Sequence, residues 1–363
     1  MTDEAFMDAA LALARRGLGT TWPNPAVGCV LVHNGRVVGR GWTAPGGRPH
    51  AETIALAQAR LAARGATAYV TLEPCSHHGQ TPPCADALVA AGVARVVVAA
   101  SDPDPRVNGA GLQRLQAAGI EVTENIRTAE AARILAGFTS RITRGRPLVT
   151  LKLASTLDGR IATGTGESQW ITGPQARRAA HALRGRHDAV MVGVGTVTAD
   201  NPDLTCRIPG FRPTPGLRIV ADSHLRTPLT ARLIATAAET PTWMLARPDT
   251  DPLRCEAFET AGARIVSVSA GPLGIDLPHA LTTLGQAGLT RLLVEGGAEL
   301  AASLLRDDLV DRIAWFHAPA VIGADGFPAV QAFGIKRLDQ MPRFRRRSVQ
   351  CLGDDILTLF DKD

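Results

Sequence analysis

The amino-terminal part of the chain alternates short apolar runs with stretches of helical periodicity. Residues 26–42, AVGCVLVHNGRVVGRGW, predict two strands joined at Asn34 and Gly35, a dipeptide typical of tight hairpin turns. Further strands are predicted at TAYVTL and ARVVVAA, and further helices from about Pro83 and about Gly109. This alternation predicts a layered α/β domain with parallel strand pairing.

The same alternation starts again after residue 146. Strand-like runs recur at PLVTLKLASTLDGRIAT, DAVMVGVG, LRIVADS, TWMLA, ARIVSV, RLLVEGG and RIAWFHA. A chain of 363 residues with 45% hydrophobic content can form two packed domains of about 150 residues each. We therefore predict two α/β domains, residues 1–146 and residues 147–363.

Cysteine usage and hydropathy predict a protein of a reducing compartment, the cytoplasm. No apolar run approaches the 18 or so residues of a membrane span. The amino terminus, MTDEAFMDAALALARRG, begins with acidic residues and has no long apolar core, so we expect no signal peptide. The cysteines are scattered without the spacing of a disulfide framework, at Cys29, Cys75, Cys84, Cys206, Cys255 and Cys351.

The positive charge does not by itself predict a nucleic-acid partner. The net charge is +5 and the pI is about 9.1, but the basic residues cluster only in RFRRRS, which we interpret as a solvated surface. The chain has one tyrosine and 4% aromatic residues, so stacking platforms for bases are scarce. A moderate positive charge fits a phosphorylated small molecule equally well.

A histidine and a glutamate stand at the head of an apolar helix in PHAETIALAQA. Pro49 suits a helix entry, which places His50 and Glu52 in the first turn. Alone, the glutamate is explained by the helix dipole, and a lone histidine is more often a core residue than a ligand.

The downstream stretch LEPCSHHGQTPPC supplies cysteines that could bind a metal together with the histidine. One imidazole, from His50, and two thiolates, from Cys75 and Cys84, form a zinc set that leaves a fourth position for water. His77 and His78 are close enough to be alternative ligands. The order H-x-E followed by P-C and a second cysteine is typical of zinc nucleobase deaminases, although residues 76–83 separate the cysteines here.

Two glycine turns between strand and helix indicate a dinucleotide site in the second domain. Glu295-Gly296-Gly297 follows one apolar run, and VMVGVGTVTADNP places Thr196 and Asp200 after another. Neither turn has the G-x-G-x-x-G pattern, so we do not expect a standard Rossmann unit. Tight packing is the alternative explanation for each glycine pair.

Other residues of the second domain are candidates for a polar ligand. Lys152 is one of three lysines in the chain and lies inside a predicted strand, which indicates a need for a compact ammonium in a pocket; the alternative is an edge position. Arg184 and Arg207 are suited to a phosphate. Ser168 and Trp170 in GESQWITG are suited to a hydroxyl contact and a flat wall, although tryptophan is more often buried in a core.

The chain as a whole resembles one family, the bifunctional riboflavin-biosynthesis enzymes in which a pyrimidine deaminase is fused to a 5-amino-6-(5-phosphoribosylamino)uracil reductase. The resemblance covers nearly the whole chain. It is carried by NPAVGCVLV, PHAE, TLEPCSHHGQTPPC, DPRVNGAG, LKLASTLDGRIA, SQWITG, VGTVTADNPDLTCR and VEGGAEL.

The resemblance implies a three-layer cytidine-deaminase-like domain followed by a dihydrofolate-reductase-like domain that uses NADPH. It implies that Glu52 moves protons beside a zinc ion held by His50, Cys75 and Cys84. Contacts with NADPH would come from Ala154, Trp170, Thr196, Asp200, Ser223 and Gly297. Contacts with the phosphorylated pyrimidine would come from Lys152, Ser168, Arg184, Leu204, Arg207 and Glu295.

The implied reactions are zinc-dependent hydrolytic deamination of 2,5-diamino-6-ribosylamino-4(3H)-pyrimidinone 5′-phosphate and reduction of its ribosyl group to ribityl. Asp200 is a candidate proton donor for the reduction. Two residues depart from the family pattern, Thr43 and Asp104, and both concern contacts of the deaminase substrate. We expect a homo-oligomer that binds neither nucleic acid nor membrane.

Two other readings of the zinc motif remain. A tRNA or free-base deaminase with an accessory domain fits the basic pI, but it is opposed by the scarcity of aromatic residues and by the second dinucleotide-like domain. A structural zinc module without activity is opposed by Glu52, because a structural site needs no base beside an open position.

Overall fold

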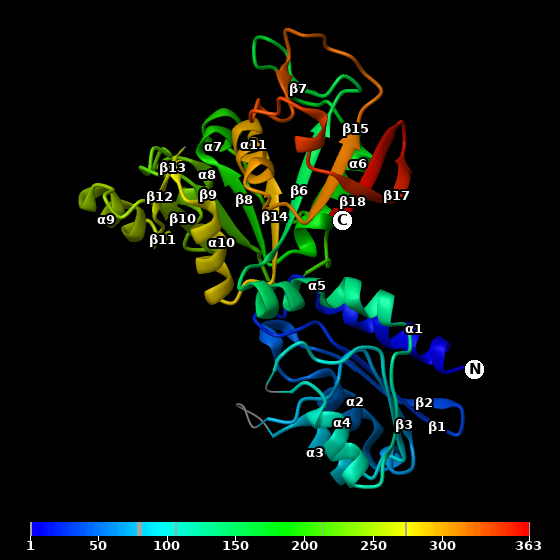
Figure 1. The fold of residues 1–363 in the computed structure, drawn as a ribbon. Helices are drawn as coiled ribbons and strands as arrows, with labels where there is room; N and C mark the ends of the chain where they lie inside the picture. Colours follow the sequence, from blue (N-terminus) through cyan, green and yellow to red (C-terminus); the bar gives the residue numbers. More distant parts are fainter. Residues whose placement is uncertain (1, 78–81, 106, 213, 273, 363) are drawn as a thin grey trace. The chain divides into compact units, whose positions relative to one another are not determined.

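The computed structural model describes residues 2–77, 82–105, 107–212, 214–272 and 274–362. The chain divides into two compact units, Met1–Gly145 and Arg146–Asp363. Each unit is an α/β structure with its own sheet and its own buried apolar core (Figure 1). The expected class of two α/β domains is confirmed.

The described part of the first unit contains a five-stranded sheet in the order β2-β1-β3-β4-β5. Its strands are β1 (Gly28–His33), β2 (Arg36–Trp42), β3 (Thr67–Val70), β4 (Arg95–Val98) and β5 (Glu121–Thr123). Its helices are α1 (Asp3–Ala14), α2 (Ala51–Ala59), α3 (Cys84–Ala91), α4 (Ala110–Ala117) and α5 (Thr128–Arg144), with short 3-10 turns η1 (Arg15–Gly17), η2 (Pro45–Gly47) and η3 (Arg60–Ala63).

The pairing in this sheet is mixed. β1 and β2 form the hairpin expected at Asn34 and Gly35, and β1 also pairs antiparallel with β3. β3, β4 and β5 run parallel, which confirms the parallel pairing expected from the runs TAYVTL and ARVVVAA. The antiparallel pair of β1 and β2 agrees with the hairpin prediction, because a two-residue turn can join only antiparallel strands.

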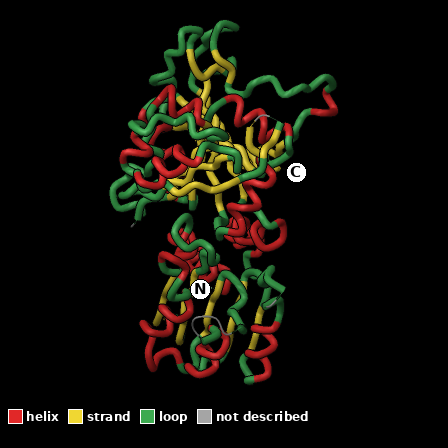
Figure 2. The backbone as a smooth tube through the Cα atoms, turned by 90° about the vertical axis from the view of Figure 1, so that its left-hand side faces the viewer, coloured by secondary structure: helices red, strands yellow, loops and turns green. Residues whose placement is uncertain are grey.

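Glycines let helices lie directly on both faces of this sheet. A Cβ on Gly28 would lie 2.0 Å from the carbonyl oxygen of Ala10 in α1. A Cβ on Gly41 would lie 2.4 Å from the carbonyl oxygen of Ala51 in α2. Gly41 pairs with Cys29, the neighbour of Gly28, so the two glycines face opposite sides of the sheet. The unit therefore has three layers, with the strands between helices (Figure 2).

The described part of the second unit contains a nine-stranded sheet in the order β11-β10-β9-β8-β14-β6-β15-β18-β17. Its strands are β6 (Leu148–Ser155), β8 (Ala189–Gly193), β9 (Leu217–Ala221), β10 (Thr242–Ala246), β11 (Arg264–Ser267), β14 (Arg291–Glu295), β15 (Arg312–His317), β17 (Phe344–Leu352) and β18 (Asp355–Lys362). Two small ladders add β7 (Arg160–Ala162) with β16 (Phe327–Pro328), and β12 (Ala270–Gly271) with β13 (Gly274–Ile275).

Helices connect the parallel strands of this unit. They are α6 (Pro174–Gly185), α7 (Val194–Asp200), α8 (Arg232–Ala235), α9 (Pro252–Thr260), α10 (Leu277–Gln286) and α11 (Ala298–Arg306), with a 3-10 turn η4 (Leu338–Gln340). The strands from β11 to β15 run parallel, whereas β18 and β17 complete the sheet as an antiparallel hairpin. The basic stretch RFRRRS begins β17, whose side chains are mostly exposed, in agreement with a solvated surface.

No helix in the described ranges has the length and apolar character needed to cross a membrane.

The contact between Gly41 and α2 gives a first prediction. Gly41→Ala would place a methyl group against the backbone of Ala51, so α2 must shift. We expect a loss of about 1–3 kcal/mol in the free energy of unfolding of the first unit, the usual effect of overpacking, together with lower zinc content. Urea unfolding and metal analysis measure the two effects.

Gly195→Ala is the control for this variant, because a Cβ at Gly195 meets nothing within 4 Å. Unfolding midpoints and zinc contents that match the wild type in both variants would show that α2 does not depend on the close approach.

Candidate functional site

Three side chains from separate segments of the first unit form a metal-binding group. His50 caps the N-terminus of α2, Cys75 follows β3, and Cys84 is the first residue of α3. His50 Nδ1 lies 3.7 Å from Cys75 Sγ and 3.3 Å from Cys84 Sγ, and all three ligand atoms lie within 4.8 Å of one another. Zinc bonds of ordinary length in a tetrahedral arrangement separate nitrogen and sulfur by about 3.5 Å. The donor set and its spacing therefore fit zinc.

The electrostatics of this group favour the binding of a cation. The hydrogen bond from the Cys84 thiol lowers the pKa of Cys75 to about 4, and the same bond raises the pKa of Cys84. The interaction with Cys75 also raises the pKa of His50. Within the cysteine pair, the shared hydrogen bond favours the thiolate at Cys75 and the thiol at Cys84. A cation stabilises both residues as thiolates, because metal ligands must be deprotonated.

Glu52 lies beside this group and is buried. Its side chain is 4% exposed, and burial raises the pKa of Glu52 to about 7. A carboxyl group with a pKa near neutrality can both accept and return a proton during a reaction. Glu52 therefore has the protonation behaviour of a general acid–base residue.

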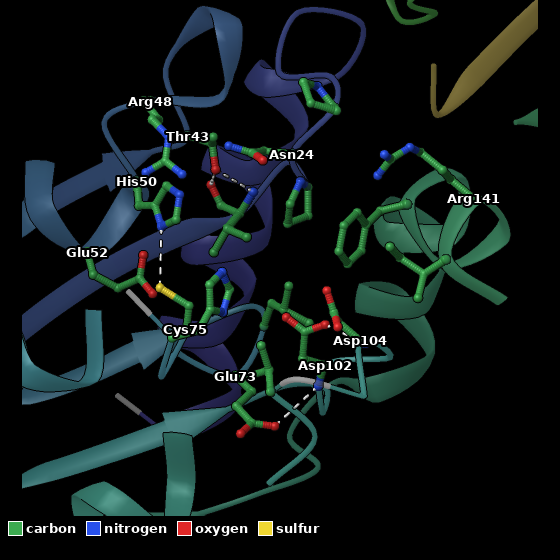
Figure 3. A pocket seen from close by; sticks show the side chains of 18 residues that line it. Asn24, Thr43, Arg48, His50, Glu52, Glu73, Cys75, Asp102, Asp104 and Arg141 are labelled. Atoms are coloured by element: carbon green, nitrogen blue, oxygen red, sulfur yellow. Dashed lines mark hydrogen bonds between the residues drawn. The ribbon is translucent and has the colours of Figure 1, made fainter. Parts of the chain in front are cut away.

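His50, Glu52 and Cys75 open onto a cavity of about 280 Å³ within the first unit. Figure 3 shows Arg48 and Thr43 beside His50, Asp102 and Asp104 on another wall, and Arg141 reaching in from α5. The lining thus combines a metal-binding group with cationic and anionic side chains. Such a cavity is suited to a small polar ligand.

The two residues that depart from the family pattern both line this cavity. The hydroxyl of Thr43 accepts a hydrogen bond of 3.0 Å from the backbone N–H of Val27. The backbone N–H of Asp104 donates to the carboxylate of Asp102 over 2.8 Å. The expected alternative ligand His77 is exposed and lines the cavity but is outside the metal-binding group found among the described residues, and His78 lies outside the described residues.

Sequence reasoning missed several residues of the cavity wall. Asn24 lies within the motif NPAVGCVLV, Arg48 directly precedes PHAE, and Asp102 lies two positions before DPRVNGAG, so their position in the chain was a usable signal. Arg141 lies on α5, far from every motif of the first domain. Its place in the cavity follows only from the tertiary structure.

In the second unit, the polar candidates gather at one edge of the sheet. The neighbouring parallel strands β9, β8, β14 and β6 bring their carboxyl ends to this edge. Both expected glycine turns are confirmed there, with Gly193 capping α7 and Gly297 capping α11. A Cβ on Gly296 or Gly297 would lie 3.6 or 3.5 Å from Thr196 Oγ1, and both glycines have positive φ. Ligands of open α/β sheets bind at such carboxyl edges.

A buried carboxylate organises the charges at this edge. Glu295 accepts two hydrogen bonds from Arg184, of 2.6 and 2.9 Å, and Lys152 Nζ lies 3.8 Å from it. Burial alone would raise the pKa of Glu295, but the charges of Arg184 and Lys152 lower it to about 2. Burial lowers the pKa of Lys152 and raises that of Asp200, and each charge partly offsets the shift of the other. The cluster holds a half-buried ammonium next to an acid.

Two readings of single residues are corrected here. Lys152 pairs with Glu295 in β14 and with Ala314 in β15, so it lies in the middle of the sheet and the edge alternative is wrong. Trp170 is 67% exposed, with the guanidinium of Arg177 4.6 Å from its ring, so it is not a core residue.

The remaining candidates differ in what they offer. Arg184 uses its guanidinium on Glu295 and on the carbonyl oxygen of Thr205, and Arg207 is exposed and pairs with Asp203. The side chain of Leu204 is buried in the core, so only its backbone can meet a ligand. Ser223 follows β9, and Ala154 lies on β6 opposite Phe316. Ser168 lies with Trp170 in the segment before α6.

Comparisons with known proteins agree with both units. Residues 147–358 match the family model of the RibD C-terminal domain, and residues 1–100 match the cytidine and deoxycytidylate deaminase zinc-binding region. The riboflavin biosynthesis protein RibD of Escherichia coli (strain K12) is 43% identical over 367 residues, covering 98% of this chain and 98% of that protein. RibD of Actinobacillus pleuropneumoniae is 42% identical over 358 residues, covering 98% and 94%.

Solved structures are similar over the same extent. One form of Acinetobacter baumannii RibD has a TM-score of 0.89 at 37% identity and covers 99% of both chains. A Thermotoga maritima protein described as a diaminohydroxyphosphoribosylaminopyrimidine deaminase/5-amino-6-(5-phosphoribosylamino)uracil reductase has a TM-score of 0.86 at 32% identity, also over 99% of each chain. With a zinc-binding deaminase region followed by a reductase domain, the chain belongs to the RibD family of bifunctional riboflavin biosynthesis enzymes.

Proposed function

We propose that the first domain deaminates 2,5-diamino-6-ribosylamino-4(3H)-pyrimidinone 5′-phosphate, and that the second domain reduces the ribosyl group of the product to ribityl with NADPH. The observation that carries this proposal is the group of His50, Cys75 and Cys84 beside the buried Glu52. A tRNA deaminase would need the same group but would have no use for the glycine turns and buried charges of the second unit.

The deamination is assigned to zinc and Glu52. Zinc held by one imidazole and two thiolates would activate water for attack near neutral pH. Glu52 takes one proton from the attacking water and passes it to the ring nitrogen. It then takes the proton of the added hydroxyl group and passes it to the amino group, which leaves as ammonia. Its pKa of about 7 supports this exchange, because neither protonation state is strongly favoured.

The phosphate of the substrate calls for cationic partners in the same cavity. Arg48 and Arg141 line it, and guanidinium groups match the oxygens of a phosphate. Asp102 and Asp104 line it as well and can accept hydrogen bonds from hydroxyl or amino groups. This lining supports a phosphorylated, hydroxyl-bearing pyrimidine rather than a free base.

The reduction is assigned to the carboxyl edge of the second sheet. NADPH supplies a hydride to C1′ of the opened ribose. The turn from Gly297, the neighbouring Thr196 and the segment containing Ser223 hold the dinucleotide, with Ala154, Trp170 and Asp200 completing its contacts. Lys152, Ser168, Arg184, Leu204, Arg207 and Glu295 hold the substrate. Asp200 provides the proton for the sugar oxygen, and its raised pKa supports that role.

We also infer that the protein works in the cytoplasm as a homo-oligomer, without a nucleic-acid partner. The two thiolate ligands must stay reduced to bind metal, which supports a reducing compartment.

The zinc assignment predicts about one zinc ion per chain. Cys75→Ser combined with Cys84→Ser removes both sulfur ligands and should abolish zinc binding. Metal analysis of the purified proteins measures this loss. Cys255→Ser is the control, because Cys255 lies on α9 in the second unit. Full zinc content in the double variant would rule out the site.

Glu52→Gln should lower the rate of ammonia release by about 10²–10⁴, the usual effect of losing a general acid–base residue. Zinc should stay bound, because Glu52 is not among its ligands. Oxidation of NADPH on the already deaminated substrate should stay at the wild-type rate. Glu124→Gln, at an exposed position of the same unit, is the matched control. Loss of both activities would show that the two domains do not act independently.

Lys152→Met tests the reductase site, because it removes the ammonium and keeps a long apolar stem in the central strand. We expect substrate binding to weaken by about 1.5–3 kcal/mol, the contribution of a charge-assisted hydrogen bond, with little change in NADPH affinity. Steady-state kinetics and NADPH binding measure the two quantities. Lys336→Met, at an exposed position, is the control. Unchanged reductase kinetics would remove Lys152 from the site.

A further inference from the structure

Glu73 is a buried residue of the lining of the deaminase cavity and has no role in the chemistry assigned above. Its side chain is 3% exposed, and it lies in the segment between β3 and Cys75. We propose that Glu73 is a positioning residue of the deaminase, which holds the cavity-lining loop of residues 102–105 and 107–109 in a fixed place relative to the metal ligands. This inference rests on the proposed deaminase function.

The contacts of Glu73 close the loop at both ends. Oε2 accepts hydrogen bonds from the backbone N–H of Asp102, over 3.3 Å, and of Gly109, over 3.0 Å. Oε1 accepts one from the backbone N–H of Gly111, over 3.0 Å. One carboxylate therefore joins the beginning of the loop to its end and to the first turn of α4. Because Gly109 and Gly111 are at the N-terminus of α4, the negative charge is also favoured by the helix dipole.

Two glycines fit α4 to this carboxylate. Gly109 caps the helix with a φ of +87°, a backbone conformation that side chains disfavour. A Cβ on Gly111 would lie 2.0 Å from the carbonyl oxygen of Pro74 and 3.2 Å from Glu73 Oε1. The helix thus lies directly on the segment that leads to Cys75, and no side chain separates them.

The loop held in this way forms part of the cavity. Asp102, Asp104 and Val107 line it, and Figure 3 shows Asp102 next to the Glu73 carboxylate and Asp104 beyond it. Inside the loop, the N–H of Asp104 donates to Asp102 and the N–H of Val107 donates to the carbonyl oxygen of Asp104. A displacement at Asp102 would therefore be passed on to Asp104 and Val107.

The segment that contains Glu73 also contains the metal ligand Cys75. Cys75 follows Glu73 by two positions, and Arg114 of α4 donates to the carbonyl oxygen of Ser76 over 3.1 Å and pairs with Asp86 of α3 over 2.6 Å. The metal ligands therefore keep supports that do not involve Glu73. Loss of the carboxylate should mainly affect the loop, and so the binding of the substrate more than the chemical step.

Glu73→Gln tests this role, because the amide keeps the size of the side chain but directs an NH₂ group at one of the backbone N–H donors. We expect KM for the deaminase substrate to rise on the order of tenfold, since a hydrogen bond to a charged group is replaced by a repulsive contact. We expect kcat within about threefold of the wild type and zinc content unchanged. Backbone amides of 102–111 should exchange hydrogen faster.

Glu73→Asp keeps the charge and should recover part of the KM, and Glu124→Gln should match the wild type in every measurement. A KM for Glu73→Gln within twofold of the wild type would overturn the proposal. So would a fall in kcat that only follows loss of zinc, because that result indicates a structural role alone. If Glu73→Gln does not fold, slower or unchanged amide exchange in 102–111 of Glu73→Asp would overturn it, and faster exchange with a raised KM would support it. Absence of ammonia release by the wild-type protein would instead reject the proposed deaminase function.

Discussion

The deaminase site depends on two helix N-termini that meet at the same place. α2 begins immediately after His50, and α3 begins at Cys84. Both helices present their positive ends to the cysteine sulfurs, which favours thiolates and therefore metal binding. The backbone N–H of Cys84 also donates to Cys75 Sγ over 3.3 Å. This convergence requires α2 to lie directly on β2, which glycine at position 41 makes possible.

The second domain stabilises a buried anion with two cationic side chains. The carboxylate of Glu295 is shared between the guanidinium of Arg184 and the ammonium of Lys152. A buried ion pair is costly to break, since removal of one partner leaves the other unpaired. Arg184 is therefore more than a candidate ligand for a phosphate. It also keeps the carboxylate of Glu295 ionised beside Lys152.

Local sequence was enough for most of the elements and for the metal-binding group. The hairpin at Asn34 and Gly35, the main parallel strands and both glycine turns were predicted, because each depends on neighbouring residues. The features that were not predicted mostly depend on contacts between residues far apart in the sequence. One exception is the hairpin of β17 and β18, whose two-residue turn, Gly353-Asp354, is a local signal that the sequence analysis overlooked. Arg141 reaches its cavity from α5, and the pairing of Arg184 with Glu295 joins positions far apart in the chain. Patterns of apolar residues carry no information on such contacts.

The two domains share one local solution despite their different chemistry. Glu295 is the last residue of β14, and Glu73 lies in the segment that follows the carboxyl end of β3. Both carboxylates are buried, and each is surrounded by donors, three backbone amides in one case and two cations in the other. A buried carboxylate with several donors restricts the orientation of all of them at once, because each must keep its hydrogen-bond distance. A single side chain of this kind can therefore fix the geometry of a site. Glu73 does so by holding a loop, and Glu295 does so by holding a lysine.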